Sequence, residues 1–325
     1  MKTIAQFIHD GIATPSDLQD ALQTAMQLEF ATIPPYLCAE WSINTDTSRV
    51  VTGKIQLIVK QEMYHFALAG NMLSAIGRAP MIAVKDFIPT YPANILPGGI
   101  PQHLAVDLQP LSHEQLQVFM QIEYPEFPPV ALRAGTPPTT IGEFYNTISD
   151  GFNTVKPTIN PNAYFVTMGQ AVFPIKTIED AQKAIAQIKG EGEGTQAVDG
   201  EGTHASPYQP DGKTFAHYYM FKEIFLGKTL VQRSGGWVFD DPPITMPTVY
   251  NFTQSTATPS PSLEFNQTLS SLLQHLQDCW AKGEALKKSI NIMNDMQEIG
   301  QDLIQRGVRP EFLWNPPPAG QPLLR

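Results

Sequence analysis

The chain has 325 residues, of which 42% are hydrophobic and 16% charged, and its formal net charge at pH 7 is -10. It is long enough to bury the core of one large domain or two small ones, and an acidic chain without clustered Lys and Arg excludes nucleic acid as a partner. Its two cysteines, Cys38 and Cys279, exclude a disulfide framework, and without a signal-like start or an apolar run of about 20 residues we expect a cytoplasmic protein with no membrane partner.

The first predicted helix starts at Ser16, whose hydroxyl can cap a helix N-terminus. A stripe at helical spacing places a glutamate among apolar side chains: Leu18, Leu22, Ala25 and Glu29. We expect Pro34 and Pro35 to kink or end this helix, because a proline inside a helix removes a backbone hydrogen bond.

A second helix is predicted from about residue 53 to residue 76, and its apolar side again contains a glutamate: Ile55, Val59, Glu62, Phe66, Ala69, Leu73 and Ile76. An ionised carboxylate on such a stripe is costly unless it is paired or bound to a metal, so Glu29 and Glu62 need partners. His65 follows Glu62 by three residues. Both side chains therefore project from one face and can offer an oxygen and a nitrogen to one metal.

Shorter helices follow a proline-rich connection over residues 78–111. Two of them open with pairs at capping-box spacing: Ser112 with Gln115, for a helix to about Tyr124, and Thr140 with Glu143, for a helix through Ile148. Further helices are predicted at 178–189, 214–226 and 263–306, and the glycine-rich acidic segment 190–203 between the first two is most simply a solvated loop. Strands are expected to be scarce.

A lone glutamate on one helix, followed by Glu-x-x-His on the next, is the first half of the constellation that di-iron and di-manganese bundles use. Glu29, Glu62 and His65 fit that order. The alternative is the same bundle without a metal, in which the two glutamates are paired with His65 and with buried hydroxyls such as that of Tyr36.

The segment over residues 28–36, LEFATIPPY, followed by QEMYH over residues 61–65, resembles the ferritin-like domain found alone or joined to iminophenyl-pyruvate dimer synthases of bisindole biosynthesis. Later blocks resemble that family in the same order: IEYP from Ile122, TIGEFY from Thr140, GEGT from Gly192 and HYYMF from His217. The resemblance spans about residues 16–230. It implies an all-α, ferritin-like helical bundle with long Pro/Gly-rich connections and a carboxylate-bridged metal site.

The resemblance also implies a set of metal ligands: Glu29, Glu62, His65, Glu143, Glu193 and His217. At the third helix the periodicity favours Glu123, which shares a face with apolar side chains, whereas Glu143 is equally well explained as a capping-box partner of Thr140. We take Glu143 from the resemblance and keep Glu123 as the alternative. Glu193 and His217 lie 24 residues apart (217 − 193), instead of forming a second Glu-x-x-His pair on one helix.

We expect residues 1–246 to form the metal-binding bundle with its insertions, 247–262 to be a linker, and 263–325 to form a long C-terminal helix packed on the bundle and a Pro-rich tail. Glutamate and histidine ligands suit iron, with two ions per chain, and manganese is the alternative. The resulting hypothesis is a non-haem di-iron oxidase or oxygenase of small-molecule or secondary metabolism.

The partners of such an enzyme would be O2 and a small organic substrate. We expect aromatic side chains to hold the substrate: Phe30, Tyr36, Trp41, Tyr64 and Phe66. The rival hypothesis is a ferritin-like protein that binds or stores iron without turning over an organic substrate. The sequence leaves the oligomeric state open, with a dimer as one candidate.

Overall fold

The computed structural model describes residues 2–99, 104–126, 140–196, 205–234 and 236–318. Helices dominate this part of the chain, and the strands within it form two antiparallel two-stranded sheets. The prediction of an all-α bundle with few strands is confirmed. The elements are α1 (Ile4–Asp10), α2 (Pro15–Ser42), α3 (Arg49–Ala75), the 3-10 turn η1 (Lys85–Phe87), α4 (His113–Ile122), α5 (Ile141–Val155), α6 (Ile178–Glu193), β1 (Thr195–Gln196), β2 (Ala205–Ser206), α7 (His217–Leu226), β3 (Lys228–Arg233), β4 (Gly236–Pro243), α8 (Leu263–Lys282) and α9 (Leu286–Gln305).

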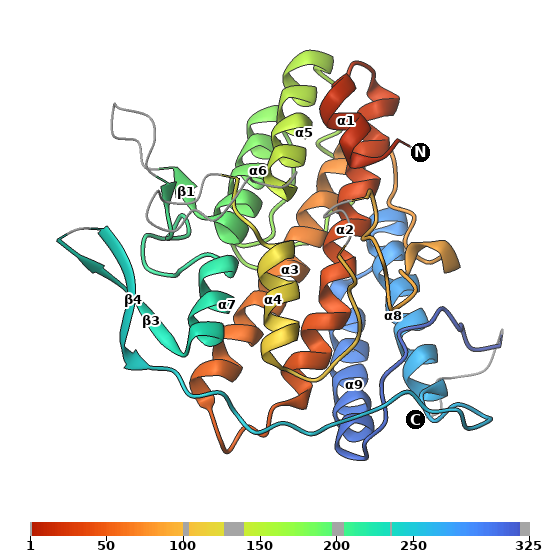
Figure 1. Cartoon of the computed structure of the whole chain (residues 1–325). Coiled ribbons are helices and arrows are strands. Elements are labelled where there is room, and N and C mark those ends of the chain that lie inside the picture. Colours follow the sequence, from red (N-terminus) through yellow and green to blue (C-terminus); the bar gives the residue numbers. More distant parts are fainter. Residues whose placement is uncertain (1, 100–103, 127–139, 197–204, 235, 319–325) are drawn as a thin grey trace.

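The long helices α2 and α3 pack against each other at the centre of the molecule (Figure 1). If α2 and α3 are counted as the first two helices of a four-helix bundle, the third and the fourth are each interrupted and consist of two shorter helices. The third is α4 followed by α5, and the fourth is α6 followed by α7. Helix α4 contacts α7, and α5 contacts α6, so the two interrupted helices run alongside each other (Figure 1). Both interruptions therefore fall at the middle of the bundle, where two helices end and two begin.

Helix α2 starts earlier and runs further than its sequence suggests. Thr14 caps it by accepting a hydrogen bond from the backbone N–H of Asp17 at 3.1 Å, and Pro15 is its first residue. Pro34 and Pro35 lie inside the helix, which continues to Ser42, so of the two expected outcomes, a kink or an end, the helix end is wrong.

A tyrosine compensates for part of what these prolines remove. Pro35 has no N–H to offer the carbonyl of Ala31, four residues earlier. The Tyr91 hydroxyl donates to that carbonyl instead, at 2.7 Å. The unbroken helix keeps Glu29 and the residues after Pro35 on one rigid element.

The C-terminal segment forms two helices, although a single helix over 263–306 was expected. Helix α8 ends at Gly283, which has a φ of +72° and turns the chain back. Helix α9 packs on α8, and the pair packs on α2 and α3 (Figure 1). Trp280 of α8 donates to the side-chain oxygen of Asn71 of α3 at 2.8 Å, which fastens the hairpin to the bundle.

The β3–β4 hairpin was not predicted, and it projects from the bundle beyond α7 (Figure 1). Its strands carry Trp237 and Phe239, which pack with aromatic residues near α7. None of the helices in the described ranges is long and apolar enough to cross a membrane.

Candidate metal centre

Two groups of buried carboxylate and imidazole side chains meet in the middle of the bundle. The first group is Glu29, Glu62 and His65, and the second is Glu62, Glu123 and His217. Within each group the potential ligand atoms lie within 4.8 Å of one another. Glu62 belongs to both groups, so it could serve as a ligand in each of them if metal ions were bound.

The interrupted helices explain how the second group is assembled. Glu29 lies on α2, and Glu62 and His65 lie on α3, within unbroken helices. Glu123 is the residue at which α4 ends, and His217 is the first residue of α7. Two chain segments far apart in sequence thus each place one side chain at the point where a helix stops or starts.

The ring of His65 is held so that Nδ1 faces the centre. Its Nε2 atom lies 2.9 Å from a carboxylate oxygen of Glu191, the usual arrangement in which an outer carboxylate fixes a metal-binding histidine. The opposite nitrogen, Nδ1, lies 3.6 Å from Glu29 and 3.5 Å from Glu62. If Nε2 carries the proton and donates to Glu191, the Nδ1 lone pair is free to bind a cation.

His217 repeats this arrangement with an amide in place of the outer carboxylate. Its Nε2 atom lies 3.1 Å from the side-chain oxygen of Gln61, which Gln209 also contacts at 3.0 Å. Nδ1 lies 2.9 Å from Glu62 and 3.6 Å from Glu123, yet it is buried without a correctly aligned hydrogen bond to any of the described residues. A buried nitrogen that points between two carboxylates in this way fits a bound metal ion better than a hydrogen bond.

Hydroxyl groups orient all three carboxylates. Tyr145 donates to one oxygen of Glu29 at 2.5 Å, Thr32 to one oxygen of Glu62 at 2.7 Å, and Tyr36 to one oxygen of Glu123 at 2.6 Å. In each case it is the other oxygen that lies near a histidine Nδ1. Five potential ligands are therefore turned inward, each by a separate outer contact.

The buried charges of the centre shift one another's pKa values. Burial, together with the nearby charge of Glu62, raises the pKa of Glu29 to about 7 and raises that of Glu123. Burial would also raise the pKa of Glu62, but the adjacent His217 and His65 imidazoles outweigh it and hold that pKa below its ordinary value. Burial opposes the charged form of His217, but Glu123 and Glu62 raise its pKa to about 9. The metal-free site thus balances its carboxylates with protons, which a metal ion would replace.

Two residues implied as ligands lie outside both groups. The Glu143 carboxylate accepts the backbone N–H of Thr140 at 3.1 Å, and the Thr140 hydroxyl accepts the backbone N–H of Glu143 at 3.1 Å, so the pair is a capping box. Glu123, the alternative favoured by periodicity, occupies the inner position. The structure thus assigns Glu143 to the helix cap and Glu123 to the centre.

Glu193 lies next to the centre as part of its wall. Its carboxylate accepts the backbone N–H groups of Gly142 at 2.7 Å and of Glu126 at 3.0 Å. A Cβ atom at residue 142 would overlap this carboxylate, so the glycine makes room for it. Burial raises the pKa of Glu193 to about 7 in spite of these two hydrogen bonds.

Glu191 is a functional candidate that the sequence reasoning missed. The segment from residue 190 was read as a loop, whereas α6 continues through it to Glu193. Glu191 follows the buried Ile188 by three residues and Ala184 by seven, which is the helical spacing of an inward-facing position. That periodicity, extended past Gly190, is the signal that could have identified it.

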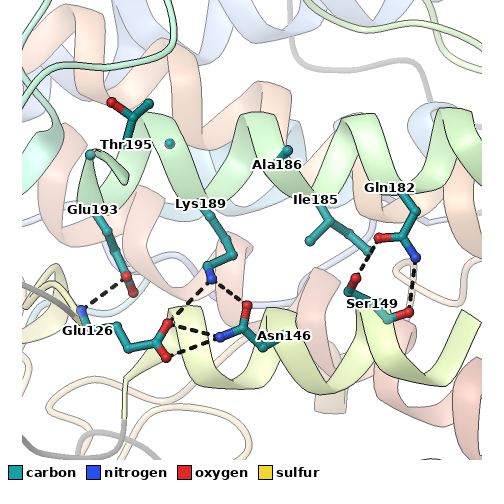
Figure 2. Close-up of a pocket in the computed structure, with 11 residues that line it drawn as sticks. Glu126, Asn146, Ser149, Gln182, Ile185, Ala186, Lys189, Glu193 and Thr195 are labelled. Carbon is teal, nitrogen blue, oxygen red and sulfur yellow. Dashed lines mark hydrogen bonds and ion pairs between the residues drawn. The ribbon is translucent and has the colours of Figure 1, made fainter. Parts of the chain in front are cut away.

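The centre borders a small inner cavity and a larger outer one. The inner cavity has a volume of about 20 Å³ and is lined by Glu29, Glu62 and Glu123 among others. The outer cavity, of about 440 Å³, lies between α5 and α6 (Figure 2). Lys189 and Glu193 line both, so these two side chains form the partition.

Charged and amide groups hold the partition together. Figure 2 shows Lys189 pointing to Asn146 and to Glu126, whose carboxylate also accepts from the Asn146 amide. The Lys189 ammonium lies 3.3 Å from Glu126. Glu193 contacts the backbone of Glu126 from the other side (Figure 2). The wall between the two cavities is therefore a connected polar network.

The five aromatic residues expected around a substrate do not gather at one place. The Lys60 ammonium lies 5.6 Å from the centre of the Tyr64 ring. Tyr36 lies at the centre, bonded to Glu123. Phe30 and Phe66 pack with Phe87, and Trp41 packs with residues of the C-terminal segment. Phe30 follows Glu29 by one residue, and one residue of an α-helix turns the side chain by about 100°, so it faces elsewhere.

Comparisons with known proteins agree with this architecture. A family model described as Ferritin-like matches residues 22–226 of the chain, and no curated protein matches. The structure is similar to the crystal structure of a ferritin like protein from Caulobacter vibrioides, with a TM-score of 0.70 and 21% sequence identity. The alignment covers 93% of this chain and 99% of that one, so the similarity in fold extends beyond residues 22–226.

Proposed function

The chain belongs to the ferritin-like family, and from this premise we propose that it is a non-haem di-metal protein with two iron ions per chain, acting as an oxidase or oxygenase. Manganese is the alternative metal, since it accepts the same oxygen and nitrogen ligands. The observation that carries this proposal is the pair of three-residue groups that share Glu62, with both histidine Nδ1 atoms turned inward.

The proposed ligand set is Glu29, Glu62, His65, Glu123 and His217. When bound, the two metal ions supply redox chemistry with O2. The chain itself holds its carboxylates and imidazoles in place through hydroxyl, carboxylate and amide groups, and it surrounds them with buried side chains that exclude bulk water.

An organic substrate would be held in the outer cavity. The inner cavity, of about 20 Å³, has room for a molecule of the size of water or O2 and for little more. The cavity of about 440 Å³ beyond Lys189 and Glu193 is large enough for a small metabolite. The resemblance to the ferritin-like part of iminophenyl-pyruvate dimer synthases supports a role in secondary metabolism, with the reaction left open because fold does not fix chemistry.

The second candidate function is iron binding without turnover of an organic substrate. The small volume of the inner cavity favours it, because about 20 Å³ leaves no room for an organic molecule directly against the ligands. Size-exclusion mass and metal content separate the candidates. A monomer or dimer with about two metals per chain supports the enzyme, whereas a large shell that takes up many ions supports storage.

The decisive experiment is metal analysis of protein purified without a histidine tag and reconstituted anaerobically with Fe(II). Wild type should bind two ions per chain, and Glu62→Ala should bind none, because both groups lose a member. Glu143→Ala is the matched control, since it removes a nearby glutamate that serves a helix cap. Retention of stoichiometric iron by Glu62→Ala would refute the assignment. O2 consumption by the loaded wild type would then separate redox activity from binding alone.

A further inference from the structure

Two buried glutamine side chains lie on the Nε2 side of the His217 ring, opposite the Nδ1 atom that faces the carboxylates. Gln61 and Gln209 are 7% and 4% exposed. The Gln61 amide nitrogen donates to the Gln209 oxygen at 2.8 Å, and the Gln209 nitrogen donates to the Gln61 oxygen at 3.0 Å. The Gln61 oxygen also lies 3.1 Å from Nε2 of His217. The two amides therefore form a reciprocal pair that contacts a proposed ligand.

A backbone carbonyl fixes which way round the two amides lie. The oxygen and the nitrogen of an amide group have nearly the same shape, so their partners decide which is which. The Gln209 nitrogen lies 3.1 Å from the backbone oxygen of Phe215, which can only accept a hydrogen bond. Because the same NH2 group also points to one atom of the Gln61 amide, that atom is the oxygen, and it is the atom that faces His217.

The orientation of the Gln61 amide determines the tautomer of His217. An oxygen beside Nε2 requires a hydrogen on Nε2, which leaves the lone pair of Nδ1 for a metal ion. The reversed amide would place an NH2 group beside Nε2, would favour the hydrogen on Nδ1 and would remove that nitrogen from the second group. Reversal would also turn the Gln209 oxygen toward the oxygen of Phe215, and two acceptors repel each other.

The loop that carries Gln209 is closed by hydrogen bonds of its own. The backbone N–H of Gln209 donates to the carbonyl of Thr214 at 2.7 Å. The Asp211 carboxylate accepts the backbone N–H and the hydroxyl of Thr214, at 2.8 and 2.6 Å. The rings of Tyr208 and Phe215 stack with their centres 4.9 Å apart. The loop leads directly into α7, so one short segment supplies both the anchor and the proposed ligand.

We propose that Gln61 and Gln209 are positioning residues of the metal centre, which keep His217 in the tautomer that offers Nδ1 to the second metal ion. The inference rests on the proposed function, because it assigns these residues a role toward that metal. His65 provides a comparison within the same centre. Its Nε2 faces the carboxylate of Glu191, and an ionised carboxylate presents only acceptors whichever way it lies. An amide can serve His217 in the same way only while a second amide holds its orientation.

The test is a titration of the full-length protein with Fe(II) in the absence of O2, in which two binding steps report the two groups. Gln209→Met keeps a side chain of similar length and removes both the donor and the acceptor. It should weaken the binding of one of the two ions about tenfold and leave the other unchanged, because the Gln61 amide is then free to reverse. Gln23→Met is the matched control, since it removes another buried amide, which is bonded to the backbone of Met81, and it should change neither step.

A second substitution separates a role in orientation from a role in packing. Gln61→Glu places accepting oxygens beside His217 whichever way the side chain lies, as Glu191 does for His65. Combined with Gln209→Met, it should therefore recover most of the lost affinity. A loss caused by poorer packing at residue 209 would not respond to a change at residue 61.

A measurement on the wild type decides the point even if Gln209→Met does not fold. In long-range proton–nitrogen spectra of the Zn(II)-loaded protein, labelled at histidine, His217 should carry its hydrogen on Nε2. Wild type that binds fewer than two ions would refute the proposed function and this inference with it. Two ions in the wild type would overturn this inference alone if Gln209→Met binds both normally, if Gln61→Glu recovers nothing, or if His217 binds through Nε2.

Discussion

Glu191 and His65 are joined by their side chains, with a carboxylate oxygen of Glu191 2.9 Å from the histidine Nε2 atom. The contact sets the orientation of the imidazole ring, so that Nδ1 faces Glu29 and Glu62. Glu191 therefore positions a proposed ligand and comes from α6, a different helix from that of His65.

Removing this carboxylate should weaken metal binding without abolishing it. We expect Glu191→Ala to lower metal affinity about 10- to 100-fold, the usual cost of losing an outer partner of a ligating histidine. Glu191→Gln keeps an accepting oxygen, so its metal affinity should lie between that of Glu191→Ala and that of the wild type. Competition with a chelator of known affinity measures the change. Glu179→Ala, at an exposed position of the same helix, serves as the control, and an equal loss there would argue against a specific role for Glu191.

Replacing Glu123 by alanine should change the number of metal ions bound per chain, whereas replacing Glu143 should not. Glu123→Ala removes a member of the second group alone, so the variant should retain at most one metal per chain. Glu143→Ala should retain both metals and lose about 1 kcal/mol in the free energy of unfolding, because the α5 cap is lost. Metal analysis and urea unfolding of each variant give the two readouts. Two metals bound to Glu123→Ala would remove it from the ligand set.

Metal uptake should release protons and therefore strengthen as the pH rises. In the metal-free site the pKa of Glu29 is about 7 and that of His217 about 9, so both groups hold protons at neutral pH that a metal must displace. The apparent affinity should rise about tenfold per pH unit for each proton released. Chelator competition at several pH values between about 6 and 9 measures this slope. A flat profile would mean that these groups do not bind the metal.

Chelation should lower the thermal stability of the wild-type protein. A metal bound only to the folded state stabilises it by about 4 kcal/mol when its concentration is about 1,000 times Kd. Its removal also leaves three carboxylates close together in the core. Differential scanning calorimetry with and without chelator should show a fall of several degrees in Tm. Glu62→Ala should show no such fall, and an equal shift in that variant would point to metal bound elsewhere.

The long helices were the most predictable part of the centre. Glu29 and Glu62 interrupt apolar stripes that extend over several turns, and such stripes fix which side of a helix is buried. The same reasoning placed Glu123 on the inner face of α4, where the structure has it. Periodicity thus identified the buried side of both long helices and of the shorter α4.

Residues near helix ends were harder to place. Glu143 opens α5, where its side chain can bond to its own helix, and a family resemblance cannot show which of two nearby glutamates turns inward. The continuation of α6 through Gly190 and Gly192 was not predicted, because glycine has a low helix propensity and its presence favours a loop. The break at Gly283 has a local signal that was passed over, because glycine is favoured where a helix ends in a left-handed conformation.

The division of the third and fourth bundle positions into pairs of helices has a consequence for the order in which the centre forms. Residues of the first group are at most 36 positions apart (65 − 29), and they meet as soon as α2 and α3 form a hairpin. His217 is 155 positions from Glu62 (217 − 62), so the second group requires closure of a far longer loop. One half of the metal centre is thus a local product of folding, and the other half waits for the last part of the bundle to dock.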